Sequence, residues 1–190
     1  MEKLTEVRWH ARGGQGAVTA AKLLAEAALS QGKYFQAFPE YGPERMGAPI
    51  QAFTRISGDP IYIKSSITNP DIVVVLDPTL LKSIDVTVGL ADEGILIINT
   101  DASPAEIRAS MGLVGRRVFT VPATQIALDT IGKPIPNTPM LGALAKATAL
   151  MRLEDIRSHL QASFGKKFAS DVIEGNVRAL EQAYEEAKGE

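Results

Sequence analysis

The fold is decided by residues 7–31, which read VRWHARGGQGAVTAAKLLAEAALSQ. Residues 7–11 alternate weakly and are β-prone, which predicts a first strand. The glycine-rich segment 11–16 breaks that pattern, and Gly32 is a suitable end for the segment that follows. Between them, apolar residues recur at helical spacing: Val18, Ala21, Leu24, Ala25 and Ala28. A strand, a glycine turn and a helix in this order predict the start of an α/β sheet.

Two continuous apolar runs predict the centre of that sheet. DIVVVL (residues 71–76) and GILII (residues 94–98) contain no alternation, as is typical of strands covered on both faces. Residues 34–38 and 117–121 predict further strands, and residues 123–131 predict a helix.

Residues 50–56 alternate between apolar and polar side chains, and the alternation resumes at 61–63 after Gly58-Asp59-Pro60. This pattern predicts an antiparallel hairpin between the two segments.

The last third of the chain predicts helices, at roughly 139–151, 153–163 and 168–187. We expect one domain over residues 1–190, with a sheet core at about 1–135 and a helical extension at about 136–190. The predicted fold class is therefore α/β: a Rossmann-like, mostly parallel sheet with an antiparallel hairpin and a helical C-terminal third.

The composition excludes several function classes. The chain has 190 residues, a formal net charge of −2 and no polybasic segment, so nucleic-acid and anionic-membrane binding gain no support. It has no cysteine, which excludes disulfides, thiol catalysis and Cys-ligated zinc or iron–sulfur clusters in this chain. With two histidines, a multi-His metal site is implausible. No signal-peptide core or long apolar span occurs, so we expect a cytoplasmic protein whose reactive cofactor, if it has one, belongs to a partner.

The glycine-rich turn is the first candidate for a binding site. Arg12, Gly13, Gly14, Gln15 and Gly16 lie where a strand meets a helix, and backbone N–H groups there can approach a phosphate. The spacing is not that of a dinucleotide-binding fingerprint, and no P-loop lysine follows. The alternative is a tight turn that simply requires small residues.

A second candidate is the loop FPEYGPERMGAP (residues 38–49), which carries its charges at its centre. Arg45 can clamp a phosphate or carboxylate through two hydrogen bonds. Alternatively, Glu40 or Glu44 pairs with Arg45 inside the loop.

Other polar residues lie at expected element ends. Asn137 or Thr138 can cap the helix expected near residue 139 or contact a ligand there. Asp77 and Asn99 end strands at the expected carboxyl edge of the sheet, where α/β proteins bind ligands, and both can cap a helix instead.

His10 is expected to be a structural histidine. Because we find no nucleophile–base set, the residues by themselves predict a ligand-binding module without independent catalysis.

Four stretches taken together resemble the gamma subunits of the 2-oxoacid:ferredoxin oxidoreductases, and within that family those of the pyruvate enzyme. They are WHARGGQGAVTAAKLLAEAA, GKYFQAFPEYGPERMGAPIQAFTRIS, PDIVVVLDPTLL and IPNTPMLGAL. The resemblance implies a complex with alpha, beta and delta subunits and with ferredoxin. Thiamine diphosphate and [4Fe–4S] clusters would lie on the partner subunits, and coenzyme A would be a ligand of this domain.

The resemblance also implies site residues. The family's glycine-rich loop matches Arg12 to Gly16, its Glu-Arg loop matches Glu44 and Arg45, and its Asn-Thr-x-x-Leu-Gly stretch begins at Asn137 and Thr138. Met46 stands where a second arginine is common, which leaves Arg45 as the main candidate cation. Two alternatives stay open: a purely structural interaction subunit, and the gamma subunit of a branched-chain 2-oxoacid or 2-oxoglutarate enzyme.

Overall fold

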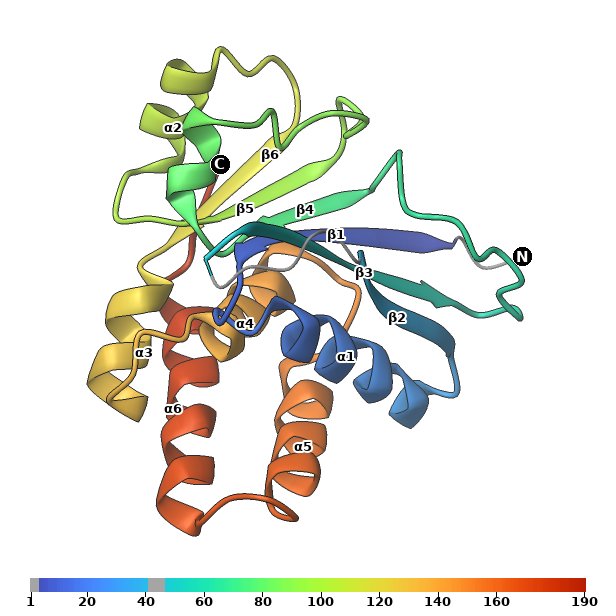
Figure 1. The fold of residues 1–190 in the computed structure, drawn as a ribbon, viewed down its shortest axis with the longest axis vertical. Coiled ribbons are helices and arrows are strands. Elements are labelled where there is room, and N and C mark those ends of the chain that lie inside the picture. The colour runs from blue at the N-terminus through green and yellow to red at the C-terminus, as the bar shows by residue number, and fades with distance from the viewer. Residues whose placement is uncertain (1–3, 41–46) are drawn as a thin grey trace.

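The computed structural model describes residues 4–40 and 47–190, which form a seven-stranded sheet in the order β2-β3-β1-β4-β5-β6-β7 (Figure 1). The central strands β1, β4, β5 and β6 are parallel, whereas β2 and β3 on one side and β7 on the other pair antiparallel. The strand bounds are β1 Thr5–Arg12, β2 Tyr34–Glu40, β3 Pro49–Ser57, β4 Ile72–Val75, β5 Ile95–Asn99, β6 Arg117–Val121 and β7 Lys188–Gly189. The predicted fold class is confirmed.

Helices cover both faces of the sheet. α2 lies above it in Figure 1, and the other α-helices lie below it. Their bounds are α1 Ala17–Ala27, α2 Pro104–Met111, α3 Ala123–Ile131, α4 Asn137–Ala147, α5 Leu153–Phe164 and α6 Ser170–Glu186, with short 3₁₀ turns η1 Ala28–Gln31 and η2 Pro78–Lys82. In the part of the chain that the structure describes, no helix combines the length and apolar character that a membrane crossing needs.

The two apolar runs are central strands, as predicted. Val74 of β4 and Ile97 of β5 belong to the core between the sheet and the helices α1 and α4. Val73 and Leu96 belong to the smaller core between the sheet and α2. Strands that bury both faces need apolar residues without alternation, which explains the continuous runs.

The predicted hairpin is wrong in its second strand. β3 pairs with β2, and residues 61–63 form no strand. Instead, the buried Arg55 donates hydrogen bonds to the carbonyl oxygens of Ile63 and Ser65 at 3.4 and 2.8 Å, which holds this segment beside the sheet. β2 also continues through Pro39, because an edge strand tolerates a missing N–H donor.

The helical last third shares its core with the sheet. One hydrophobic cluster joins Trp9 of β1 and Leu24 of α1 to Leu141 of α4 and Leu180 of α6. Gly142 permits this packing, because a Cβ atom there would collide with the carbonyl oxygen of Leu180.

One face of β1 carries a buried basic pair. Arg8 Nε donates to His10 Nε2 at 3.1 Å, and Arg8 Nη2 donates to the carbonyl oxygens of Val86 and Val88. Burial, followed by the charge of Arg8, lowers the pKa of His10 to about 4. The imidazole is therefore neutral and accepts a hydrogen bond at Nε2, while its buried Nδ1 has no hydrogen-bond partner among the described residues.

This pair predicts a loss of stability in mild acid. Below pH 6.5 the unfolded chain protonates His10 and the folded chain does not, so the free energy of unfolding falls as pH drops toward 4. Between pH 7 and 4.5 the loss due to His10 is about 2 kcal/mol. Urea unfolding of His10→Gln across this range should lack that part of the slope.

His159→Gln is the matched control, since it removes the other histidine and leaves the Arg8–His10 pair intact. Equal slopes in the native protein and His10→Gln would contradict the assignment. Asp77 and Asp85 lose their stabilising charge mainly below their ordinary pKa of 3.8. The lowered pKa of Glu106 acts from its ordinary value of 4.5 downward, and it contributes equally in the native protein and in His10→Gln.

Candidate functional site

The glycine-rich turn lies at the carboxyl edge of the parallel strands. β1 ends at Arg12 and α1 begins at Ala17, with Gly14 and Gly16 at φ values of 97° and 81°. These left-handed conformations favour glycine. Gly16 is the N-cap of α1, and no side chain caps the helix.

Some of the turn's donors are already used inside the protein. The Gly13 N–H donates to the Ala48 carbonyl oxygen at 3.1 Å, and the Gln15 N–H donates to that of Arg12 at 3.2 Å. Within residues 4–40 and 47–190, no hydrogen-bond partner is found for the N–H groups of Gly14 and Gly16. Together with the uncapped first turn of α1, they leave a cluster of donors suited to an anion.

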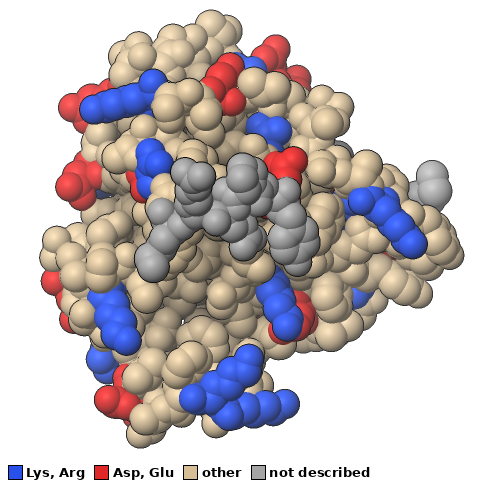
Figure 2. Space-filling model, viewed as in Figure 1, with Lys and Arg blue, Asp and Glu red and all other residues tan. Residues whose placement is uncertain are grey.

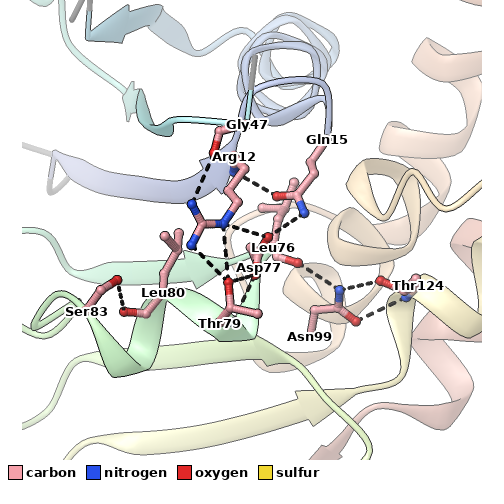
Figure 3. Close-up of polar contacts among 10 residues, drawn as sticks. All are labelled: Arg12, Gln15, Gly47, Leu76, Asp77, Thr79, Leu80, Ser83, Asn99 and Thr124. Carbon is pink, nitrogen blue, oxygen red and sulfur yellow. Dashed lines mark hydrogen bonds and ion pairs between the residues drawn. The ribbon is translucent and has the colours of Figure 1, made fainter. Parts of the chain in front are cut away.

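The Asp77 carboxylate holds the turn in place (Figure 3). Its Oδ2 accepts a hydrogen bond from Gln15 Nε2 at 2.8 Å and lies 3.4 Å from Arg12 Nε. Its Oδ1 accepts from both the N–H and the hydroxyl of Thr79, at 2.9 and 2.6 Å. Gln15 also bonds back to Arg12, because its Oε1 accepts a hydrogen bond from the Arg12 backbone N–H at 2.8 Å.

This network sets the charge state of Asp77. Burial by itself would raise the pKa of the carboxyl, but hydrogen bonds from Thr79 and Gln15 and the charge of Arg12 lower it below its ordinary value. Asp77 is thus an ionised anchor, and it also caps η2, one of the two roles foreseen for it.

Arg12 connects the turn to the end of the 38–49 loop. Its guanidinium donates to the Gly47 carbonyl oxygen at 3.1 Å and to the Thr79 hydroxyl. Arg12 therefore makes three side-chain hydrogen bonds within the protein. The candidate residues Glu44 and Arg45 lie outside the described residues, just before Gly47 in the chain.

The N-terminus of α4 meets the turn from the other side. Asn137 is 8% exposed, and its amide lies so close to Gly16 that a Cβ atom there would approach Asn137 Nδ2 to 2.7 Å. The predicted capping by Asn137 or Thr138 is wrong, because Pro136 is the N-cap and both residues lie inside the helix. Thr138 is fully buried, and its hydroxyl donates to Asn176 Oδ1 at 2.8 Å, which joins α4 to α6.

Asn99 also lies at this edge of the sheet, and its side chain is hydrogen-bonded within the protein. Its Nδ2 donates to the Leu76 carbonyl oxygen at 2.8 Å, and its Oδ1 accepts from the Thr124 N–H at the start of α3. It therefore caps α3 rather than the next helix, which Ser103 caps. Sequence analysis missed the role of Thr79, although its position two residues after Asp77 is the signature of a side-chain-closed turn.

No group of three or more His, Asp or Glu side chains suited to a metal ion occurs in the described segments 4–40 and 47–190. The donors gathered at the site are the N–H groups of Gly14 and Gly16, the first turn of α1 and the amide of Asn137.

The model of the family described as pyruvate ferredoxin/flavodoxin oxidoreductase matches residues 6–186. Full-length relatives carry gamma-subunit names. The chain is 51% identical to the pyruvate/ketoisovalerate oxidoreductases common subunit gamma of Pyrococcus furiosus, covering 97% of this chain and 98% of the relative. The chain belongs to the gamma subunits of the 2-oxoacid:ferredoxin oxidoreductases.

Further comparisons agree with this gamma-subunit assignment. The pyruvate synthase subunit PorC of Thermotoga maritima is 51% identical, covering 98% of this chain and 96% of the relative. A crystal structure of pyruvate oxidoreductase subunit PORC from T. maritima matches with a TM-score of 0.86 and 47% identity, covering 98% of each chain.

A more distant structure has the same fold. The 2-oxoglutarate:ferredoxin oxidoreductase from Magnetococcus marinus, with 2-oxoglutarate, coenzyme A and succinyl-CoA bound, matches with a TM-score of 0.77 at 19% identity. The match covers 96% of this chain and 31% of the larger chain, so the gamma-type fold occurs there within a longer polypeptide.

The Asp77 network predicts that Asp77→Asn loosens the glycine-rich turn. The amide introduced at position 77 is neutral, so the ion pair with Arg12 is lost. The hydrogen bond from Gln15 Nε2 is weakened, because an amide oxygen is a weaker acceptor than a carboxylate, or lost if the amide N–H₂ faces Gln15. Hydrogen bonds to a charged group contribute about 1.5–3 kcal/mol each. Amide hydrogen exchange of residues 12–16 should accelerate, and the free energy of unfolding should fall by about 1–2 kcal/mol.

Asp85→Asn is the matched control. Asp85 accepts the same pair of hydrogen bonds from Thr87 that Asp77 accepts from Thr79, but it lacks the contacts to Arg12 and Gln15. If both variants changed exchange at residues 12–16 equally, Asp77 would not be the anchor of the turn.

Proposed function

We propose that this gamma-type chain serves a multisubunit pyruvate:ferredoxin oxidoreductase and that it positions coenzyme A and supports assembly of the complex. The enzyme converts pyruvate, coenzyme A and oxidised ferredoxin into acetyl-CoA, CO₂ and reduced ferredoxin. The relatives named for pyruvate support this substrate. The partners are alpha, beta and delta subunits, which carry thiamine diphosphate and the [4Fe–4S] clusters.

One observation carries the coenzyme A role: unused donors converge at a helix N-terminus. The N–H groups of Gly14 and Gly16 and the first turn of α1 lie beside the amide of Asn137, at the carboxyl edge where α/β proteins bind ligands. Such a cluster suits a pyrophosphate. The coenzyme A complex of the distant M. marinus enzyme, whose chain includes the same fold, supports the ligand.

The chemistry of this chain is positioning. Held by its phosphates, coenzyme A presents its thiol to an intermediate on the partner subunits, and a fixed approach lowers the entropic part of the barrier. Arg45, a candidate outside the described residues, supplies a guanidinium, a group that can bind a phosphate through two hydrogen bonds. In this proposal no side chain of this chain forms or breaks a covalent bond during the reaction.

A structural interaction subunit is the second candidate. It is favoured by Arg12, whose guanidinium is engaged inside the chain with Gly47, Thr79 and Asp77. On either proposal, this chain does not select the 2-oxoacid. A gamma subunit named as common to pyruvate and ketoisovalerate enzymes implies that other subunits select the oxoacid.

The decisive variant is Arg45→Ala in the reconstituted complex. We expect the KM for coenzyme A to rise about tenfold or more while the KM for pyruvate is unchanged, since one bidentate phosphate contact is lost. Arg45→Lys, which keeps the charge but not the fork, should give an intermediate KM. Steady-state assays with varied coenzyme A measure this.

An unchanged KM for coenzyme A in Arg45→Ala would remove Arg45 from the site. Loss of co-purifying subunits, with coenzyme A kinetics intact in the remaining complex, would favour the interaction subunit.

A further inference from the structure

A groove with a volume of about 540 Å³ begins beside the glycine-rich turn and extends along α1 toward α5 and α6. Volumes of this size are typical of small-molecule sites. Figure 2 shows the lower half of this face hollowed, with basic side chains around it. Since α1 lines the groove from Val18 to Glu26, the groove is about 12 Å long.

The upper end of the groove is built for an anion. Gly14 and Gly16 line it, and the first turn of α1 is uncapped. Asn137 adds an independent observation. Its Oδ1 accepts from the Thr138 N–H at 2.9 Å, and its Nδ2 has no hydrogen-bond partner among the described residues. A side chain that is more than nine-tenths buried thus presents an unused donor to the groove.

Lysines continue the positive charge along the groove. Lys22, Lys133 and Lys167 line it, and the carboxylate in it, Glu26, is already engaged. One oxygen of Glu26 lies 3.5 Å from Lys22 Nζ, and the other lies 3.0 Å from His159 Nε2. For Lys133 and Lys167, no carboxylate partner is found in the described part of the chain.

The lower end of the groove is aromatic. Phe164 and Phe168 line it with ring centroids 5.1 Å apart, and Phe168 is 49% exposed. Val172 and Ile131 supply further apolar wall. An exposed ring beside a lysine offers a flat ligand both a stacking face and a nearby cation.

We propose that this groove binds an adenosine phosphate, with a phosphate at the N-terminus of α1 and the base at the Phe164–Phe168 pair. Phosphate oxygens accept from the Gly14 and Gly16 N–H groups and from Asn137 Nδ2. Lys133 balances the charge of this phosphate, and Lys167 takes a second phosphate near the base.

Two sources supply this chemistry: the nucleotide half of coenzyme A, and a free adenine nucleotide. In the first case the inference rests on the proposed function and adds a direction to it. The nucleotide half occupies the groove, and the thiol arm extends from the turn, away from α5 and α6.

The test is calorimetric titration of the full chain with adenosine 3′,5′-bisphosphate, with AMP and with inorganic phosphate. We expect the bisphosphate to bind most tightly and inorganic phosphate least tightly. Asn137→Asp is the sharpest variant, because the carboxylate still accepts from the Thr138 N–H but replaces the free donor with negative charge. It should fold normally and bind the bisphosphate at least about tenfold more weakly.

Adjacent lysines give a matched control pair. Lys167 lines the groove and Lys166 does not, although both are exposed in the turn that follows α5. Lys167→Glu should weaken bisphosphate binding about tenfold, and Lys166→Glu should leave it within about twofold. Phe168→Ala should weaken bisphosphate binding while leaving inorganic phosphate unaffected, because it removes only the stacking ring.

The same variants in the assembled complex identify the source. A raised KM for coenzyme A in Asn137→Asp and Lys167→Glu supports the nucleotide half of coenzyme A. Binding of the bisphosphate to the complex with unchanged coenzyme A kinetics supports a free nucleotide.

Three results would overturn the groove site. They are no nucleotide binding to the chain or the complex, equal effects of the two lysine variants, and loss of binding on assembly, which would mean that a partner subunit covers the groove. If Arg45→Ala raised the KM for coenzyme A while every groove variant left it unchanged, the proposed function would stand and this inference would fail.

Discussion

A side chain at residue 16 would collide with the Asn137 amide, and much of the site depends on this constraint. Gly16 combines a left-handed backbone with close contact to Asn137, so two helix N-termini, those of α1 and α4, meet at one point. The meeting leaves α1 without a side-chain cap and brings an unused amide donor to its first turn. Packing and donor supply therefore have the same cause.

Around this point the protein uses its own charges to make the geometry rigid. Asp77 and Arg12 are engaged with Gln15, Thr79 and the carbonyl oxygen of Gly47, so the arrangement of the turn exists before any ligand arrives. A preorganised turn loses little entropy on binding. The backbone donors, which need no rearrangement, are the groups left for an anion.

Local sequence patterns predicted the positions of strands and helices better than they predicted which strands pair and which side chains cap a helix. The apolar runs of β4 and β5 follow from neighbouring residues, and both formed strands as expected. The hairpin partner of β3 was wrong because alternation identifies a strand but not its neighbour. The predicted capping at Asn137 was wrong because α4 begins at Asn137 itself, with Pro136 as its N-cap, and the Asn137 side chain accepts a hydrogen bond from the Thr138 N–H instead.

The sequence by itself determined the α/β class, the glycine-rich turn, the absence of cysteine chemistry and, through four motifs in order, the family. These are properties of composition, periodicity and short spacing. Only the tertiary structure decided that Gly16 contacts Asn137, that Asp77 joins Gln15 to Thr79, and that lysines from three separate segments line one groove with two phenylalanines. These contacts join residues far apart in the chain. Their geometry comes from the packing of α1 and α4 against the sheet and of α5 and α6 against those helices.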